Sequence, residues 1–201
     1  MKQNDSLIKQ ENRNAKYLKE TLAYHLFWHL KYTIVCDEFK FMDLFGVRRN
    51  GYQVEFEIKV NKSDFDREIR CIIASECEHY GKDWEKYSKH KIYLTGERPK
   101  TSYDLRLESF GISDKKTPFR PNEFYFYVPD YLADYAVLKV TKLALPYGVV
   151  KIGKKDIPSG RDYFWPYTVV KKATKLHSEK ADQSIYYALA HALTIRNKLL
   201  N

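Results

Sequence analysis

Between Tyr52 and Val60 apolar residues alternate strictly with polar ones, which predicts a β-strand with two different faces. One face carries Val54, Phe56, Ile58 and Val60, and the other carries Gln53, Glu55, Glu57 and Lys59. A second apolar run lies upstream across Asn50-Gly51, a dipeptide typical of tight β-hairpin turns. We therefore expect residues 41–47 and 52–60 to pair as strands, which would bring Asp43 close to Glu57.

The rest of the chain mixes helical and strand patterns. Leucines recurring every four residues predict an amphipathic helix from Asn14 to about Leu30. Further helices are expected over 64–79, 84–94, 131–143 and 178–200, and further strands over 32–39, 123–128, 147–152 and 167–174. Ser63 is the expected cap of the helix that follows it. Residues 153–166 are expected to form a loop. This order predicts an α/β fold, an α+β sandwich with a mixed sheet flanked by helices.

The length of 201 residues suits a single domain that spans the whole chain. Residues 1–12 are expected to form a polar N-terminal extension. Residues 95–121 are rich in Lys, Arg, Ser and Pro and have no clear period, which predicts a loop insertion rather than a second domain.

Charge and cysteine content narrow the class of protein. Lys and Arg number 35 against 26 Asp and Glu, and the formal net charge of +9 favours polyanionic partners. Three cysteines, an odd and sparse set, indicate a reducing compartment. A zinc site at Cys71, Cys77, His79 and His90 is disfavoured, because no pair has CxxC spacing. No signal peptide or transmembrane run of about eighteen apolar residues is visible, so we expect a soluble cytoplasmic protein without a membrane partner.

The charged face of the predicted strand could carry chemistry. Carboxylates from Asp43 and Glu57 would form an oxygen-rich site suited to Mg²⁺. Lys59 projects from the same face and could contact a phosphate oxygen or position a water molecule. Glu20, on the first helix, could reach such a site or lie in solvent. An ordinary strand with a solvated charged face has the same pattern, so both interpretations stay open at this point.

Several segments resemble a known family. Asp43 followed by Glu57-Ile58-Lys59 resembles the D…(D/E)xK signature of the PD-(D/E)XK nuclease superfamily. The resemblance extends to MmcB-like DNA-repair nucleases and related phage proteins through EIKVNKSDF (57–65), Lys89-His90, PNEFYFYVP (121–129), PYGVV (146–150) and VVKKATKLH (169–177). Met42 stands where the superfamily name has proline, and Asn61 stands where the related segment has serine.

The resemblance implies a restriction-endonuclease-like αβββαβ core and a set of site residues. Asp43, Glu57 and the Ile58 carbonyl would hold Mg²⁺, with Mn²⁺ as a substitute, and Lys59 would be the catalytic lysine. Asp64 would support the site or charge the N-terminus of its helix. Lys89 and His90 would contact phosphate, or would lie on a solvated basic helix.

The expected function is a Mg²⁺-dependent nuclease that hydrolyses DNA phosphodiester bonds in repair, recombination or phage DNA metabolism. RNA stays open as a substrate, as does a homodimer. Two alternatives remain. The first is a non-catalytic nucleic-acid-binding protein on the same fold, and the second is an interaction protein whose charged strand is merely solvated.

Overall fold

The computed structural model describes residues 2–39, 42–73, 84–96, 120–156 and 162–199. The chain divides into two compact units, one formed by residues 1–65 with 121–201 and the other by residues 66–120. Each unit is considered by itself below. The single domain expected from the sequence stays a prediction.

The first unit is built on a six-stranded mixed sheet whose strands lie side by side in the order of the sequence. The strands are β1 (Ile34–Phe39), β2 (Met42–Val47), β3 (Gln53–Ile58), β4 (Glu123–Pro129), β5 (Gly148–Asp156) and β6 (Asp162–Lys171). β1, β2 and β3 form an antiparallel meander, β3, β4 and β5 run parallel, and β6 returns antiparallel to β5. The expected α/β fold with a mixed sheet is confirmed.

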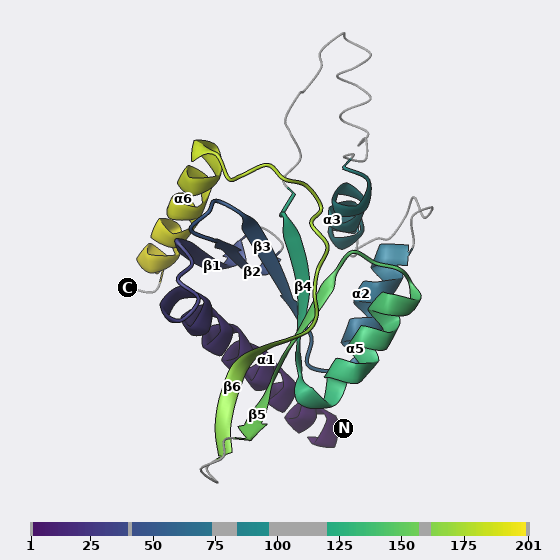
Figure 1. Ribbon diagram of the computed structural model, residues 1–201. Coiled ribbons are helices and arrows are strands. Elements are labelled where there is room, and N and C mark those ends of the chain that lie inside the picture. The colour runs from purple at the N-terminus through teal and green to yellow at the C-terminus, as the bar shows by residue number, and fades with distance from the viewer. Residues whose placement is uncertain (1, 40–41, 74–83, 97–119, 157–161, 200–201) are drawn as a thin grey trace. The chain divides into compact units, whose positions relative to one another are not determined.

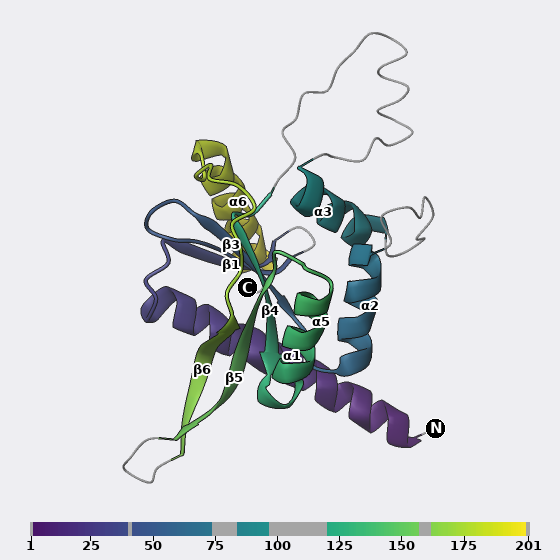
Figure 2. The ribbon, with the colours of Figure 1, turned by 45° about the vertical axis from the view of Figure 1, so that its right-hand side comes forward.

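Two helices cover opposite faces of this sheet (Figures 1 and 2). α1 (Lys2–Trp28) contacts β1, β2, β3 and β6, whereas α5 (Asp130–Lys142) contacts β4, β5 and β6. α6 (Gln183–Leu199) lies against β1. α2 (Lys62–Ile73) begins in the first unit and continues into the second, which also contains α3 (Trp84–Thr95). Within the described residues, no helix combines the length and the hydropathy needed to cross a membrane.

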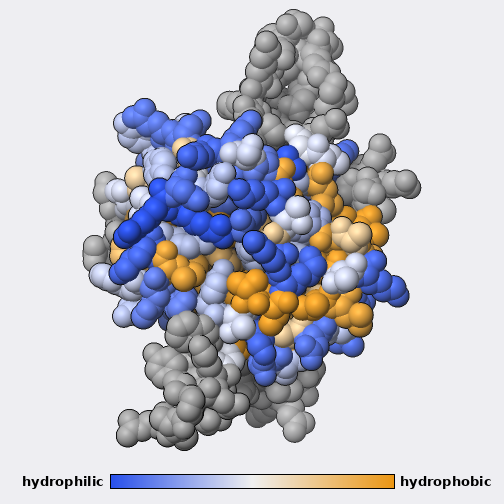
Figure 3. Space-filling view, viewed as in Figure 1, coloured by the Kyte–Doolittle hydropathy of each residue, from blue (hydrophilic) through white to orange (hydrophobic). Residues whose placement is uncertain are grey.

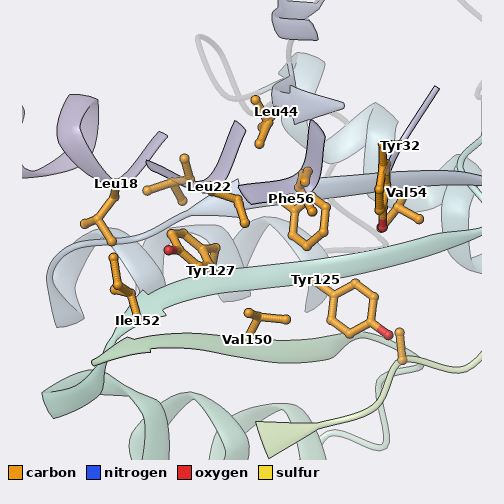
Figure 4. Packing of buried hydrophobic residues seen from close by; sticks show 13 residues of the cluster. Leu18, Leu22, Tyr32, Leu44, Val54, Phe56, Tyr125, Tyr127, Val150 and Ile152 are labelled. Carbon is orange, nitrogen blue, oxygen red and sulfur yellow. The ribbon is translucent and has the colours of Figure 1, made fainter. Parts of the chain in front are cut away.

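The main core lies between α1 and the sheet (Figure 4). Leu18, Leu22 and Leu26 of α1 are at most 5% exposed and pack on alternate strand residues. These strand residues include Leu44, Val54, Phe56, Tyr125, Tyr127 and Val150. The four-residue leucine period and the two-residue strand period therefore meet at one interface, as the sequence predicts.

A buried asparagine ties the chain after β6 to the start of β3. Asn122 is fully buried, and its side-chain Oδ1 accepts a hydrogen bond of 2.7 Å from the Gln53 amide. Its Nδ2 donates to the carbonyl oxygens of His177 and Glu179 at 3.0 and 2.6 Å. The Asn122 side chain therefore fixes the path of the chain that leads to α6. Hydrophilic residues gather on the surface over α6 (Figure 3).

Two expectations about local structure need correction, and a third concerns residues that the structure largely does not describe. The first helix starts at Lys2 rather than near Asn14, so the polar residues of the 1–12 extension continue the helix. The loop expected over 153–166 is wrong, because β5 runs to Asp156 and β6 starts at Asp162, where each strand supplies hydrogen-bond partners to the other. Most of the 95–121 insertion lies outside the described residues.

Candidate active site

The hairpin of β2 and β3 places Asp43 and Glu57 on one face of the sheet. Leu44 pairs with Phe56 and Phe45 with Glu55, so the same register puts Asp43 opposite Glu57. Directly opposed residues of an antiparallel pair project to the same side. Because Leu44 and Phe56 face α1, the two carboxylates lie on the other face. Asp43 Oδ2 accepts a hydrogen bond of 2.9 Å from the Ile58 amide, which fixes this carboxylate at the end of β3.

Lys59 lies next to Glu57, and both side chains are shielded from solvent. The Lys59 Nζ to Glu57 Oε1 distance is 2.8 Å, and each side chain is 3% exposed. Lys59 Nζ also lies 3.5 Å from Asp64 Oδ2. The Lys59 amide donates to the Tyr127 carbonyl at 3.1 Å, so the lysine starts from a backbone position that β4 fixes. The structure therefore brings Asp43, Glu57, Lys59 and Asp64 together.

The charged face of β3 is buried, contrary to the interpretation of a solvated strand. Glu55, Glu57 and Lys59 are each at most 2% exposed. Central strands of a mixed sheet are covered on both faces, and only the sheet topology reveals that β3 is central. Carboxylates are almost never buried without a compensating partner, so this face needs a role other than keeping the protein in solution.

The cap of α2 is Asn61, not Ser63. Asn61 Oδ1 accepts a hydrogen bond of 2.8 Å from the Asp64 amide, as an N-cap side chain does. Ser63 lies one position inside the helix start and donates its hydroxyl to the same Asn61 oxygen at 2.8 Å. The cap sets the first turn of α2 and so places Asp64 beside Lys59.

Burial and a neighbouring carboxylate set the electrostatics of Asp43. Burial, followed by the negative charge of Glu57, raises the pKa of Asp43 above its ordinary value. Lys59, the Ile58 amide and Lys19 act in the opposite direction without reversing the shift. A divalent cation between two neighbouring carboxylates would offset the repulsion between them.

α1 contributes a lysine that the sequence does not single out. Glu20, the residue expected to reach the site, pairs at 3.8 Å with Lys16, and both side chains are largely in water. Lys19 instead directs its ammonium to Asp43 Oδ1 at 3.7 Å and to Glu38 of β1. No sequence period links positions 19, 38 and 43, because they meet only through tertiary packing.

Lys89 and His90 lie in the second unit and are buried. Both are fully shielded from water, which excludes the solvated basic helix for these two side chains. His90 Nε2 is 2.7 Å from Glu68 Oε1, and Lys89 Nζ is 4.0 Å from the same oxygen. Glu68 therefore contacts both side chains, and it was not predicted, because nothing in the sequence distinguishes it from the other acids of its helix.

The zinc alternative gains no support. Cys77 and His79 lie outside the described residues, and Cys71 is buried. In the part of the chain that the structure describes, no three His, Cys, Asp or Glu side chains form a group that could hold a metal ion. A cation at Asp43 and Glu57 would therefore need further oxygen ligands, for which main-chain carbonyls and water are common sources.

Comparisons with known proteins do not assign a family. No family model matches the sequence, and no curated protein matches it. Among solved structures, the chain is similar to the SPO1766 protein of unknown function from Silicibacter pomeroyi, with a TM-score of 0.49 and 14% identity. The superposition covers 91% of this chain and 88% of that one. We transfer neither a fold family nor an activity from this similarity.

Proposed function

We propose that the protein is a Mg²⁺-dependent nuclease of the PD-(D/E)XK type that hydrolyses DNA phosphodiester bonds. The observation that carries the proposal is the pair of carboxylates of Asp43 and Glu57 on one face, beside the buried ammonium of Lys59. One helix, three strands, two helices and a strand parallel to β3 follow one another, which is the order of the αβββαβ core that the resemblance implies with one additional helix, α3. Asn61 replaces the serine of the related segment and keeps a capping oxygen there.

The residues of the site fit a divalent cation. Glu38, Asp43, Glu57 and Asp64 supply four carboxylates against the two ammonium groups of Lys19 and Lys59, which leaves two formal negative charges. The side chains of Asp43 and Glu57, with the Ile58 carbonyl as a further ligand, would hold the ion. Oxygen ligands of this kind are those that Mg²⁺ and Mn²⁺ prefer.

A bound Mg²⁺ would lower the pKa of a water molecule and offset negative charge on the phosphate. The chain itself would position the other groups. Glu57 holds the Lys59 ammonium at 2.8 Å, which keeps a fixed positive charge beside the carboxylates, where it can contact a phosphate oxygen or orient the attacking water. The Asp64 carboxylate lies 3.5 Å from the same ammonium and helps to hold it in this position.

Cleavage assays test the proposal directly. Circular and linear DNA, single- and double-stranded, would be incubated with the protein in Mg²⁺, Mn²⁺ or EDTA. We expect metal-dependent cleavage by the wild type, loss of cleavage in Asp43→Asn and Lys59→Met, and no loss in Glu20→Gln, a carboxylate of the same charge that lies in solvent. Cleavage that is absent, or equal in wild type and both site variants, refutes the proposal.

The same preparations separate the two alternatives. DNA binding that weakens steeply with salt, without metal-dependent cleavage, identifies a nucleic-acid-binding protein. The absence of both cleavage and salt-dependent binding leaves an interaction protein.

A further inference from the structure

Lys19 lies where its ammonium and a bound cation would compete for the Asp43 carboxylate. Its ammonium is 3.7 Å from Asp43 Oδ1, the side chain is 15% exposed, and it comes from α1 rather than from the strands that carry the carboxylates. In the protein without metal, this positive charge offsets part of the repulsion between Asp43 and Glu57. A divalent cation at the same carboxylates would repel the ammonium.

Glu38 gives the ammonium a second partner. Glu38 contacts Lys19 Nζ, and its side chain is 66% exposed, so this ion pair lies at the edge of the site. Glu38 also has a left-handed backbone with φ of 53°, although it is neither glycine nor asparagine. The register of β1 and β2 places Glu38 level with Asp43, since Asp37 pairs with Leu44 and Phe39 pairs with Met42.

Glu38 combines this backbone conformation with its contact to Lys19 of α1. A non-glycine residue in the left-handed region is strained, and such residues gather at functional sites. The strained residue and the ion pair are separate observations that point to the same contact.

We propose that Lys19 is a positioning residue that holds Asp43 in the metal-free protein, and that Glu38, which already contacts the Lys19 ammonium, retains it when a divalent cation binds. This step rests on the proposed metal site. Lys19 then sets the metal affinity by competing for Asp43, and Glu38 weakens that competition. The two residues therefore affect metal affinity with opposite signs.

Mn²⁺ binding measures this directly and without catalysis. Free Mn²⁺ would be quantified by electron paramagnetic resonance in titrations of the full-length protein. Lys19→Met is expected to lower the Mn²⁺ dissociation constant by about tenfold, since a unit charge a few ångströms from the ion opposes its binding by at least that much. Lys19→Arg keeps the charge and is expected to bind Mn²⁺ as the wild type does.

Glu38→Gln is expected to raise the dissociation constant by about threefold, which is the size of effect that a partly exposed ion pair can exert. In the double variant with Lys19→Met, the Glu38→Gln change is expected to have no further effect, because Glu38 acts through Lys19. Lys16→Met and Glu20→Gln remove the exposed pair on the same helix and control for the general loss of charge.

The outcomes separate this inference from the proposed function. A wild-type protein whose Mn²⁺ binding is absent, or is unchanged in Asp43→Asn, overturns the metal site itself. Binding that needs Asp43 but weakens in both Lys19→Met and Glu38→Gln refutes only the competition between Lys19 and the ion. Additive effects in the double variant refute the role of Glu38 as acceptor.

Discussion

Replacing Lys59 by methionine tests whether the Glu57–Lys59 ion pair is shielded from water, as its burial indicates. The substitution keeps the length of the side chain and removes its charge, so it leaves the Glu57 carboxylate 3% exposed without its partner at 2.8 Å. Breaking a buried ion pair from one side typically costs about 3–5 kcal/mol. Asp64 also loses a partner, but it is 27% exposed and water can replace the lysine.

Protonation limits this cost. In Lys59→Met the Glu57 carboxylate can bind a proton. For an ordinary glutamate, protonation costs about 3.7 kcal/mol at pH 7 and about 1 kcal/mol at pH 5. We therefore expect Lys59→Met to lose about 3–4 kcal/mol of stability at pH 7, a fall of roughly 6–15 °C in Tm for a chain of this size. The loss should shrink markedly at pH 5, where protonation is easier.

Thermal unfolding in EDTA at pH 7 and pH 5 measures both effects, with Lys16→Met as the exposed control. Saturating Mn²⁺ should recover part of the lost stability without restoring cleavage, because a divalent cation also offsets the stranded carboxylate. A loss below about 1 kcal/mol at pH 7, unchanged at pH 5, would show that Glu57 is hydrated and would refute the reasoning.

Four further substitutions test local contacts around the sheet and at the start of α2. Asn61→Ala should cost about 1 kcal/mol in urea unfolding through the lost cap of α2, whereas Ser63→Ala should cost less; equal losses would contradict the assignment of Asn61. Asn122→Ala should cost about 2–4 kcal/mol, because it strands a buried amide and two carbonyls, and a near-neutral result would mean that water replaces the side chain. His25 is buried against Tyr167, and burial, followed by the charge of His29, lowers its pKa below 6.5. Stability should therefore fall as pH falls from 6.5 through the lowered value, and His25→Phe should flatten that slope in thermal unfolding between pH 7 and pH 5.

The sequence predicts the strands well where a two-residue period is strong. Val54, Phe56 and Ile58 face the core as the alternation requires, and the Asn50-Gly51 turn fixes the register that brings Asp43 to Glu57. The strand ends near residues 153–166 were missed. Gly153, Pro158, Gly160 and Pro166 have the composition of a loop, and only pairing between β5 and β6 favours strands there.

The sequence predicts the polar partners of the site less well. Ser63 and Asn61 are both good caps two positions apart, and the choice depends on where the chain leaves β3. Lys19 and Glu20 are neighbours on α1, and only the angle at which the helix crosses the sheet decides which one reaches Asp43. The burial of Lys89 depends likewise on tertiary packing, to which its basic neighbours give no clue.

The parallel neighbours β3 and β4 are joined by all of residues 59–122, which include the second unit. The entropy of closing such a connection grows only with the logarithm of its length, so doubling the connection would cost about 0.6 kcal/mol. The connection can therefore lengthen, shorten or change composition during evolution at little cost to the sheet. Asp43, Glu57 and Lys59 all precede residue 66, so changes within 66–120 leave the sequence of the strands that carry the carboxylates unaltered.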